Sequence, residues 1–173
     1  LTLLLLERIV ASAPARIVNI SSAGHSQGRI RLDDLGAARY YYGFSQYCNT
    51  KLANVLFTYE LARRIEGTGV VAHTLHPGVF RSSLGMNNRG LVRWLWKWAH
   101  FVMSRPEKAA ATTIFVATDP EVSTQNGLYW SRCRERKSSR RSHDQKVGEE
   151  LWRISETLTG ASFPELPRKV ESN

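Results

Sequence analysis

Short runs of strand-forming residues alternate with long helical segments, and this alternation constrains the fold more than any other feature of the chain. The runs over 17–20, 70–75 and 127–131 are rich in β-branched, aromatic and other apolar residues. The first has apolar side chains on both faces, as in a strand buried within a parallel sheet. Residues 46–65 and 108–118, which separate the runs, have helical patterns. Strands separated by helices predict right-handed βαβ units, so we expect an α/β fold with a parallel sheet.

Three further helices are predicted around this frame. Residues 1–11 have leucines on every face and are followed by Ala13-Pro14, which stops a helix. Residues 91–103 are an apolar segment with Trp94, Trp96 and Trp98. Such a helix would line a pocket, rest on a membrane surface or pack in the core. Residues 145–158 are amphipathic, with four side chains spaced to face a core: Val147, Leu151, Ile154 and Leu158.

Composition excludes several classes of protein. No apolar run approaches the roughly 20 residues that cross a bilayer, so we expect no membrane anchor within this chain. Cys48 and Cys133 are far apart, and His73 and His76 point to opposite faces of a strand, so neither a disulfide framework nor a metal site is expected.

Positive charge is concentrated in one segment. Residues 131–146 hold seven arginines and lysines and two carboxylates, which is +5 of the net charge of +9. No aromatic platform or nucleic-acid module accompanies them, so we expect no nucleic-acid partner. A solvated basic loop is the plain interpretation, and contact with a membrane surface is the alternative.

The candidate chemistry lies in three motifs that follow strands or begin a helix. Ser21-Ser22 follows the first strand, Tyr47-Cys48-Asn49-Thr50-Lys51 lies on the long helix, and His76-Pro77-Gly78 follows the second strand. Tyr47 and Lys51 are one helical turn apart and share a face. A phenol is a poor base at neutral pH, but a neighbouring cation favours its phenolate. The three motifs together therefore predict proton exchange with a substrate oxygen, coupled to hydride transfer.

Three stretches carry a resemblance to a known family: R-I-V-N-I-S-S over 16–22, Y-C-N-T-K-L-A-N-V-L-F over 47–57, and H-T-L-H-P-G-V-F-R-S over 73–82. The chain resembles the short-chain dehydrogenase/reductases, and more closely their retinol dehydrogenase branch. The resemblance implies that Tyr47 is the catalytic acid and base, that Lys51 supports it, and that Ser22 orients the substrate oxygen. It also implies a set of cofactor-binding residues: Tyr47, Lys51, Pro77, Gly78, Val79 and Ser82.

The resemblance also sets expectations for the fold. It implies a partial Rossmann-like, doubly wound parallel sheet that comprises the last three strands and their helices. The N-terminal nucleotide-binding half, with its glycine-rich turn, is expected to be absent from these residues. Residues 1–160 would then be the C-terminal portion of one domain, and residues 161–173 a flexible tail. The strand over 17–20 would expose an unpaired edge.

For function, the resemblance implies an oxidoreductase that uses NADP, with NAD as the alternative cofactor. Its substrate would be a small apolar alcohol or aldehyde such as retinol or retinal. The helix over 46–65 is similar to one that the family uses to form homodimers. The family also implies an intracellular protein associated with the endoplasmic reticulum or mitochondrial membrane. A different hypothesis is a catalytically silent fragment or isoform that acts as a protein-interaction module.

Overall fold

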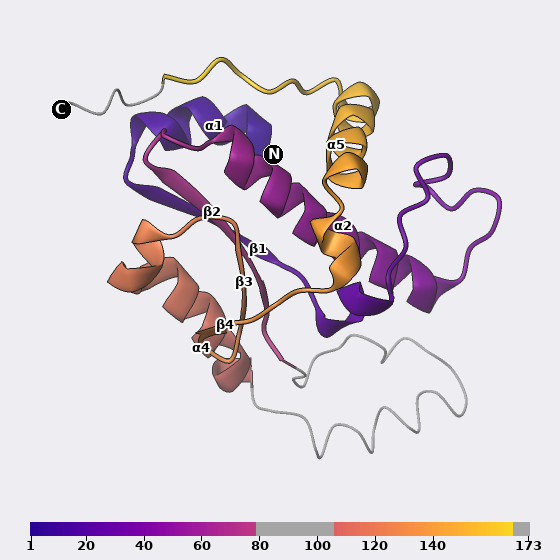
Figure 1. Cartoon of the computed structure of the whole chain (residues 1–173), viewed down its shortest axis with the longest axis horizontal. Coiled ribbons are helices and arrows are strands. Elements are labelled where there is room, and N and C mark those ends of the chain that lie inside the picture. Colours follow the sequence, from indigo (N-terminus) through magenta and orange to yellow (C-terminus); the bar gives the residue numbers. More distant parts are fainter. Residues whose placement is uncertain (79–105, 168–173) are drawn as a thin grey trace.

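The computed structural model describes residues 1–78 and 106–167 of the chain (Figure 1). Several predictions lie outside these residues. They are the helix over 91–103 with its three tryptophans, the cofactor contacts of Val79 and Ser82, and the end of the predicted tail. No helix among the described residues is both long enough and apolar enough to cross a bilayer.

Within residues 1–78 and 106–167, four strands form one sheet in the order β1-β2-β3-β4. They span Ala15–Ile20, Val70–His76, Leu128–Ser131 and Arg134–Glu135. The first three are parallel, whereas β4 pairs antiparallel with β3. Within the described residues β1 lies at one edge of this sheet, as predicted. The partial parallel α/β sheet is therefore confirmed. The sequence did not reveal β4, because it is two charged residues long and has no apolar run.

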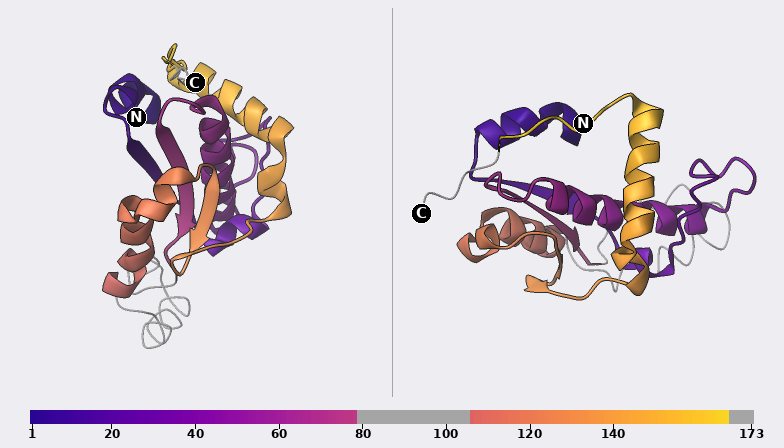
Figure 2. Two further views of the ribbon diagram at one scale, coloured as in Figure 1. Left: turned by 60° about the vertical axis from the view of Figure 1, so that its left-hand side comes forward. Right: turned by 45° about the horizontal axis from the view of Figure 1, so that its top comes forward.

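Helices cover both faces of the sheet. They are α1 (Thr2–Ala11), α2 (Gly43–Arg64), α4 (Pro106–Thr118) and α5 (Gln145–Thr159). Figure 2 shows α4 on one side of the strands and α2 on the other. Alternation along β1 explains this arrangement, since Ile17 packs with the α2 side and Val18 with the α4 side. The doubly wound architecture implied by the family resemblance is thus present.

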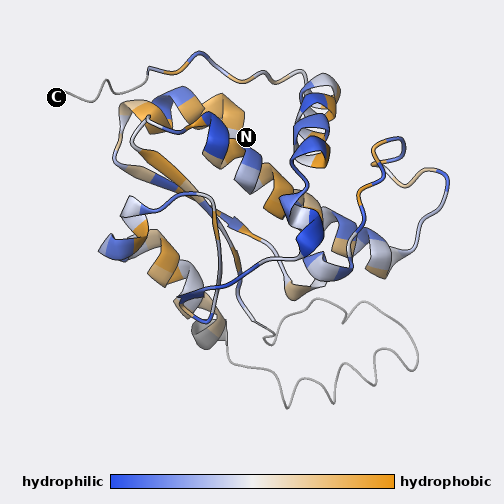
Figure 3. Ribbon diagram, in the orientation of Figure 1, coloured by the Kyte–Doolittle hydropathy of each residue, from blue (hydrophilic) through white to orange (hydrophobic). Residues whose placement is uncertain are grey.

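Two apolar clusters hold the layers together. On the α2 side, nine buried residues pack around the sheet: Leu6, Val10, Ile17, Leu61, Ala62, Ile65, Val70, Ala72 and Trp152. On the α4 side, the buried cluster consists of Leu75, Val116, Val122 and Trp130. Figure 3 shows apolar residues concentrated along β1 and β2. Burying each large aliphatic side chain contributes roughly 1.5–3 kcal/mol, so these clusters are the main stabilising term.

The prediction that Leu158 of α5 faces the core is wrong. Leu158 is 72% exposed, and Thr157 and Thr159 beside it are also exposed, because the last turn of the helix extends beyond the core. Trp152 takes its place, with 4% of its surface exposed. Its ring stacks on Phe57 of α2 at 5.3 Å between centroids. The apolar face of α5 is therefore shorter than the sequence pattern indicates, and it is centred on Leu151 and Trp152.

The basic segment after β3 is solvent-exposed, as its plain interpretation predicts. All seven of its basic side chains are exposed: Arg132, Arg134, Arg136, Lys137, Arg140, Arg141 and Lys146. None of them forms an ion pair with another described residue. The segment has more structure than a plain loop, because it contains β4 and the 3₁₀ turn η3 (Arg140–His143). In Figure 3 it appears as a hydrophilic stretch that leads to α5.

His73 is a buried core histidine of β2, with no exposed surface. Trp130 donates its indole N–H to His73 Nδ1 at 3.2 Å, so Nδ1 is an acceptor and Nε2 carries the hydrogen. Nε2 lies 3.3 Å from the carbonyl oxygen of Val122, to which it donates. Burial is the main cause that lowers the pKa of His73. The ring is therefore neutral in the folded protein and satisfied on both nitrogens.

We predict that the free energy of unfolding decreases as the pH falls below about 6.5, the ordinary pKa of histidine. Burial lowers the pKa values of His73 and His25 in the folded state. The unfolded chain therefore binds more protons than the folded protein in this window. The free energy of unfolding then falls by up to about 1.4 kcal/mol per pH unit for each histidine. Urea unfolding at several pH values between 7.5 and 5.5 measures the slope. In His73→Gln the slope should be smaller, and an unchanged slope would contradict the assignment.

Candidate active site

The candidate motifs meet at the carboxyl ends of β1 and β2. The two strands pair in parallel from Ala15 opposite Val70 to Ile20 opposite Leu75. The backbone N–H of Ser21 continues this pairing by donating to the carbonyl of Leu75 at 2.7 Å. Ser21-Ser22 and His76-Pro77-Gly78 therefore leave the sheet at the same end, where the strands terminate. This is the position at which open α/β sheets bind ligands.

The two serines after β1 have different environments. Ser21 is 2% exposed, and its hydroxyl donates to the backbone carbonyl of Lys51 at 2.8 Å. Ser22 is half-buried, and its Oγ accepts a hydrogen bond from the backbone N–H of Gly24 at 3.2 Å. Among the described residues no acceptor takes the Ser22 hydroxyl hydrogen. Of the two serines, Ser22 is therefore the one whose hydroxyl hydrogen has no acceptor within the described part of the chain.

Tyr47 and Lys51 lie one turn apart near the start of α2, and both are half-buried. The Lys51 ammonium lies 5.8 Å from the centroid of the Tyr47 ring. It donates to the carbonyl oxygen of Ile20 at 3.4 Å, and Asn54 donates to the same oxygen at 3.1 Å. No carboxylate among the described residues pairs with Lys51. The end of β1 thus holds a positive charge close to the phenol.

Gly24 is the point where Ser22 and Tyr47 converge. A Cβ placed on Gly24 would lie 3.3 Å from Cε1 of Tyr47 and 3.6 Å from Oγ of Ser22. The serine hydroxyl and the tyrosine ring therefore approach the same small volume from two elements. The sequence pattern did not single out Gly24. Its place two residues after the serine pair was the available signal.

Gly28 allows the turn that follows Ser22 to pack against α2. This 3₁₀ turn, η1 (Ala23–Gln27), ends at Gly28. A Cβ on Gly28 would lie 2.5 Å from the carbonyl oxygen of Cys48 and 2.8 Å from Cβ of Leu52. These distances are too short for any side chain. The absence of a side chain at Gly28 thus sets how closely the Ser22 turn approaches the helix that carries Tyr47.

The sequence is similar to those of several retinol dehydrogenases. Human retinol dehydrogenase 12 is 43% identical over 161 residues, which cover 92% of this chain and 50% of that protein. Human retinol dehydrogenase 14 is 42% identical over 165 residues, with 92% and 48% covered. The chain thus spans about half the length of the curated relatives it matches. The chain belongs to the retinol dehydrogenase-like branch of the short-chain dehydrogenase/reductases. It corresponds to their C-terminal portion.

The other comparisons add the fold. A solved structure of an uncharacterized protein from Mycobacterium paratuberculosis matches with a TM-score of 0.66 at 28% identity. The match covers 87% of this chain and 52% of that one. No family model matches the sequence. Because the match covers only about half of the solved structure, it agrees with the partial sheet of this dehydrogenase-like chain.

The remaining residues predicted from the short-chain dehydrogenase/reductase resemblance are divided between described and undescribed parts. Pro77 and Gly78 are half-buried and follow β2 directly. Gly78 has a φ of +92°, and its N–H donates to Nδ1 of His76 at 3.4 Å. Among the described residues, nothing lies within 4 Å of a Cβ placed there. The backbone therefore turns sharply at the same end of the sheet as Ser22.

Sequence reasoning missed His25, which lies beside the dehydrogenase motif at Ser22. It is 5% exposed, and its Nδ1 lies 2.7 Å from the carbonyl oxygen of Ser22. Burial lowers the pKa of His25, and the hydrogen bond to Ser22 offsets part of this effect. Burial also lowers the pKa of His76, with additional contributions from His25 and Arg132. Both rings are therefore neutral side chains at the rim of the candidate site.

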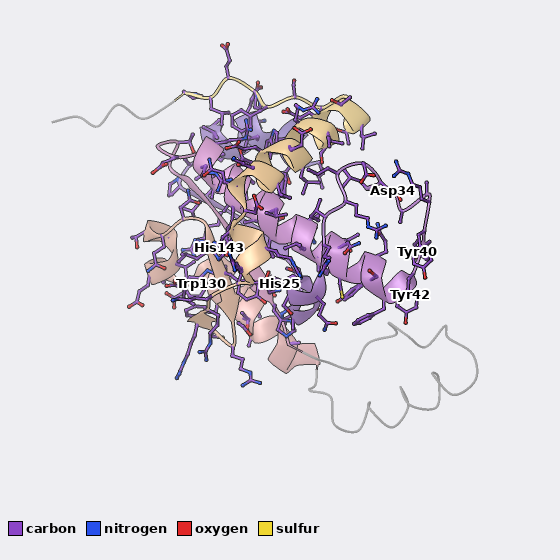
Figure 4. All side chains as sticks on the ribbon, turned by 45° about the vertical axis from the view of Figure 1, so that its right-hand side comes forward. His25, Asp34, Tyr40, Tyr42, Trp130 and His143 are labelled. Atoms are coloured by element: carbon purple, nitrogen blue, oxygen red, sulfur yellow. The ribbon has the colours of Figure 1, made fainter. Side chains whose placement is uncertain are left out.

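A cavity of about 420 Å³ lies on another face of α2. It is lined by residues of the 27–42 loop, by α2 residues other than Tyr47 and Lys51, and by Leu151 of α5. Figure 4 shows Tyr40 and Tyr42, two of its lining residues, on that loop. Ser22 is not in its wall either. The cavity is thus separate from the place where the dehydrogenase motifs converge.

Proposed function

We propose that this chain provides the proton-transfer residues of an oxidoreductase that acts on an apolar alcohol or aldehyde with a nicotinamide cofactor. The observation that carries the proposal is the convergence of Ser22 and Tyr47 at Gly24, with Lys51 beside the phenol. Family membership supports the reaction class. The names of the relatives support retinol or retinal as substrate. We propose NADP as the cofactor, on the resemblance stated above.

The chain's own residues have distinct tasks in this mechanism. The bound cofactor would supply the hydride for reduction or accept it in oxidation. Ser22 would donate its free hydroxyl hydrogen to the substrate oxygen and hold that oxygen near the phenol. Tyr47 would give its proton to this oxygen in reduction and take it back in oxidation. The Lys51 ammonium would stabilise the phenolate that remains, since an opposite charge nearby favours the ionised form.

The described residues fit a nicotinamide cofactor at the carboxyl ends of β1 and β2. Lys51 is a cation without a carboxylate partner among them. Gly78 turns the backbone at a positive φ, and no described residue lies within 4 Å of a Cβ placed there, so that a flat ring could approach Pro77 and Gly78 closely. We propose that Lys51, Pro77 and Gly78 contact the cofactor, with Tyr47 next to them. The proposed contacts of Val79 and Ser82 rest on the resemblance alone.

We predict that Ser22→Ala lowers kcat for aldehyde reduction by about 100-fold, the usual effect of removing one donor from a developing oxyanion. The protein for this test joins the chain to the part of human retinol dehydrogenase 12 that it does not cover. Turnover of retinal is followed through the absorbance of NADPH. Ser26→Ala is the matched control, because Ser26 lies in the same turn but is exposed, and among the described residues its hydroxyl bonds only to the carbonyl of Ala23. Equal kcat values for Ser22→Ala and the unchanged protein would refute this role.

A protein-interaction module is the second candidate function. It is favoured by the apolar surface of α1, where Leu4 is 78% exposed and Leu5 is 47% exposed. The edge of β1 lies next to this helix in sequence and could accept another strand. The same joined protein separates the two functions, since an interaction module would bind its partner without oxidising NADPH. Retinal-dependent loss of NADPH absorbance would therefore favour the oxidoreductase.

A further inference from the structure

His25 connects the Ser22 turn to the segment that follows β4. Its Nδ1 lies 2.7 Å from the carbonyl oxygen of Ser22. Its Nε2 accepts a hydrogen bond from the backbone N–H of Ser139 at 3.0 Å, across 114 positions in the sequence. Figure 4 shows His25 near the segment that carries His143, in agreement with the bond to Ser139. A single buried ring thus bridges the candidate site and a remote segment.

The two bonds define the protonation state of this ring. A backbone N–H can only donate, so Nε2 of His25 must be an acceptor without a hydrogen. The hydrogen of the neutral ring is then on Nδ1, which donates to the Ser22 carbonyl. The Tyr129 ring packs against His25 at 4.9 Å between centroids and holds it in this orientation. Both polar atoms of the ring are therefore satisfied by backbone groups.

The segment after β4 contacts the Ser22 turn at two points. Ser139 contacts His25 in the middle of the turn, and the Arg141 guanidinium donates to the carbonyl of Gly28 at its end, at 3.3 Å. The Ser22 carbonyl already accepts the backbone N–H of His25 at 3.1 Å. The bond from Nδ1 is thus a second bond to the same oxygen. It restricts the orientation of Ser22 more than the turn alone requires.

We propose that His25 is a positioning residue, which orients Ser22 for the proton-transfer chemistry and depends on Ser139 for its own orientation. The proposal rests on the proposed function, because it assigns a role within that site. It also gives the basic segment a role as a brace of the active-site turn. His25 does not touch the reacting atoms, so its effect should pass through Ser22 alone.

The kinetic test uses His25→Phe in the joined protein, with and without Ser22→Ala. Phenylalanine keeps an aromatic ring but removes both bonds, so we expect kcat to fall about tenfold with little change in KM. In the Ser22→Ala background the same change should have an effect of less than about twofold, because the residue that His25 orients has already lost its hydroxyl. His25→Asn, which can keep a donor at the Nδ1 position but loses the acceptor for Ser139, should recover only part of the activity. Equal reductions in both backgrounds would overturn the proposal.

A second pair of variants tests the remote end of the bridge. Ser139→Pro deletes the donor to Nε2, and the φ of −65° at Ser139 suits proline. Ser139→Ala keeps the N–H and removes a hydroxyl that has no partner among the described residues. We expect Ser139→Pro to lower kcat as His25→Phe does, and Ser139→Ala to leave it unchanged. Similar kcat values for the two variants would overturn the coupling.

A spectroscopic measurement keeps the bridge separate from the proposed reaction. ¹⁵N spectra of the His25 ring at pH 7 should show a neutral ring with its hydrogen on Nδ1, whether or not the protein turns over. Ser139→Pro should change the Nε2 shift. A hydrogen on Nε2 would overturn the bridge even in an active enzyme. The expected spectrum in a protein without retinal-dependent turnover would instead refute the proposed function, and with it the catalytic role of His25.

Discussion

Tyr47→Phe is expected to lower kcat for retinal reduction by about 10³-fold in the joined protein, since general acid catalysis typically contributes 10²- to 10⁴-fold. The substitution removes only the hydroxyl. The ring that packs against Gly24 stays, so the turn that carries Ser22 should keep its place. Stopped-flow measurement of NADPH oxidation separates the chemical step from product release. The loss should appear in kcat, with a much smaller change in KM.

Tyr41→Phe is the matched control for this prediction. Tyr41 precedes α2, is 72% exposed and lies outside the converging motifs. The same loss of a hydroxyl should therefore leave kcat unchanged at Tyr41. Residual activity of Tyr47→Phe within a few-fold of the unchanged protein would mean that another group moves the proton. A large loss in Tyr41→Phe would instead mean that the activity depends on the loop rather than on the phenol.

The layered fold could be predicted because its signals are local. The runs that became β1, β2 and β3 are apolar and bounded by turns, and the helices between them have a clear period. Features that depend on distant partners were missed or wrong. The two-residue β4 forms because Ser131 and Arg134 pair across a tight turn, which no apolar pattern marks. Leu158 has the right spacing for a core residue but lies in a turn that extends beyond the core.

The candidate site was predictable to a similar degree. Ser22, Tyr47 and Lys51 stand in recognisable motifs, and the structure brings them together at Gly24 and the end of β1. Their catalytic roles stay predictions until the variants are measured. His25 was missed because its second partner is 114 positions away, and a lone histidine has no sequence signal for such a contact. Close approach of two backbones at Gly28 is equally invisible before the chain is folded.

Gly28→Ala is expected to destabilise the protein by about 3 kcal/mol or more, the upper range for overpacking a filled site. The new methyl group would lie 2.5 Å from the carbonyl oxygen of Cys48. That atom belongs to α2 and cannot move without distorting the helix. Gly28 has a φ of −64° and a ψ of 151°, which alanine adopts readily. The cost is therefore steric rather than conformational, and it should separate the Ser22 turn from Tyr47.

Gly148→Ala provides the informative control, because it makes the same change at another buried glycine that faces α2. There a Cβ would meet its nearest atoms, Leu56 and Arg63, at 3.7 Å, which is ordinary contact. Gly148 lies inside α5, so alanine should stabilise the helix by up to about 1 kcal/mol. Urea midpoints of the two variants should thus shift in opposite directions. If both midpoints shifted equally, burial of the glycines alone would explain the shifts. The close contact of the Ser22 turn with α2 would then not be the cause of the position of Ser22 beside the Tyr47 phenol.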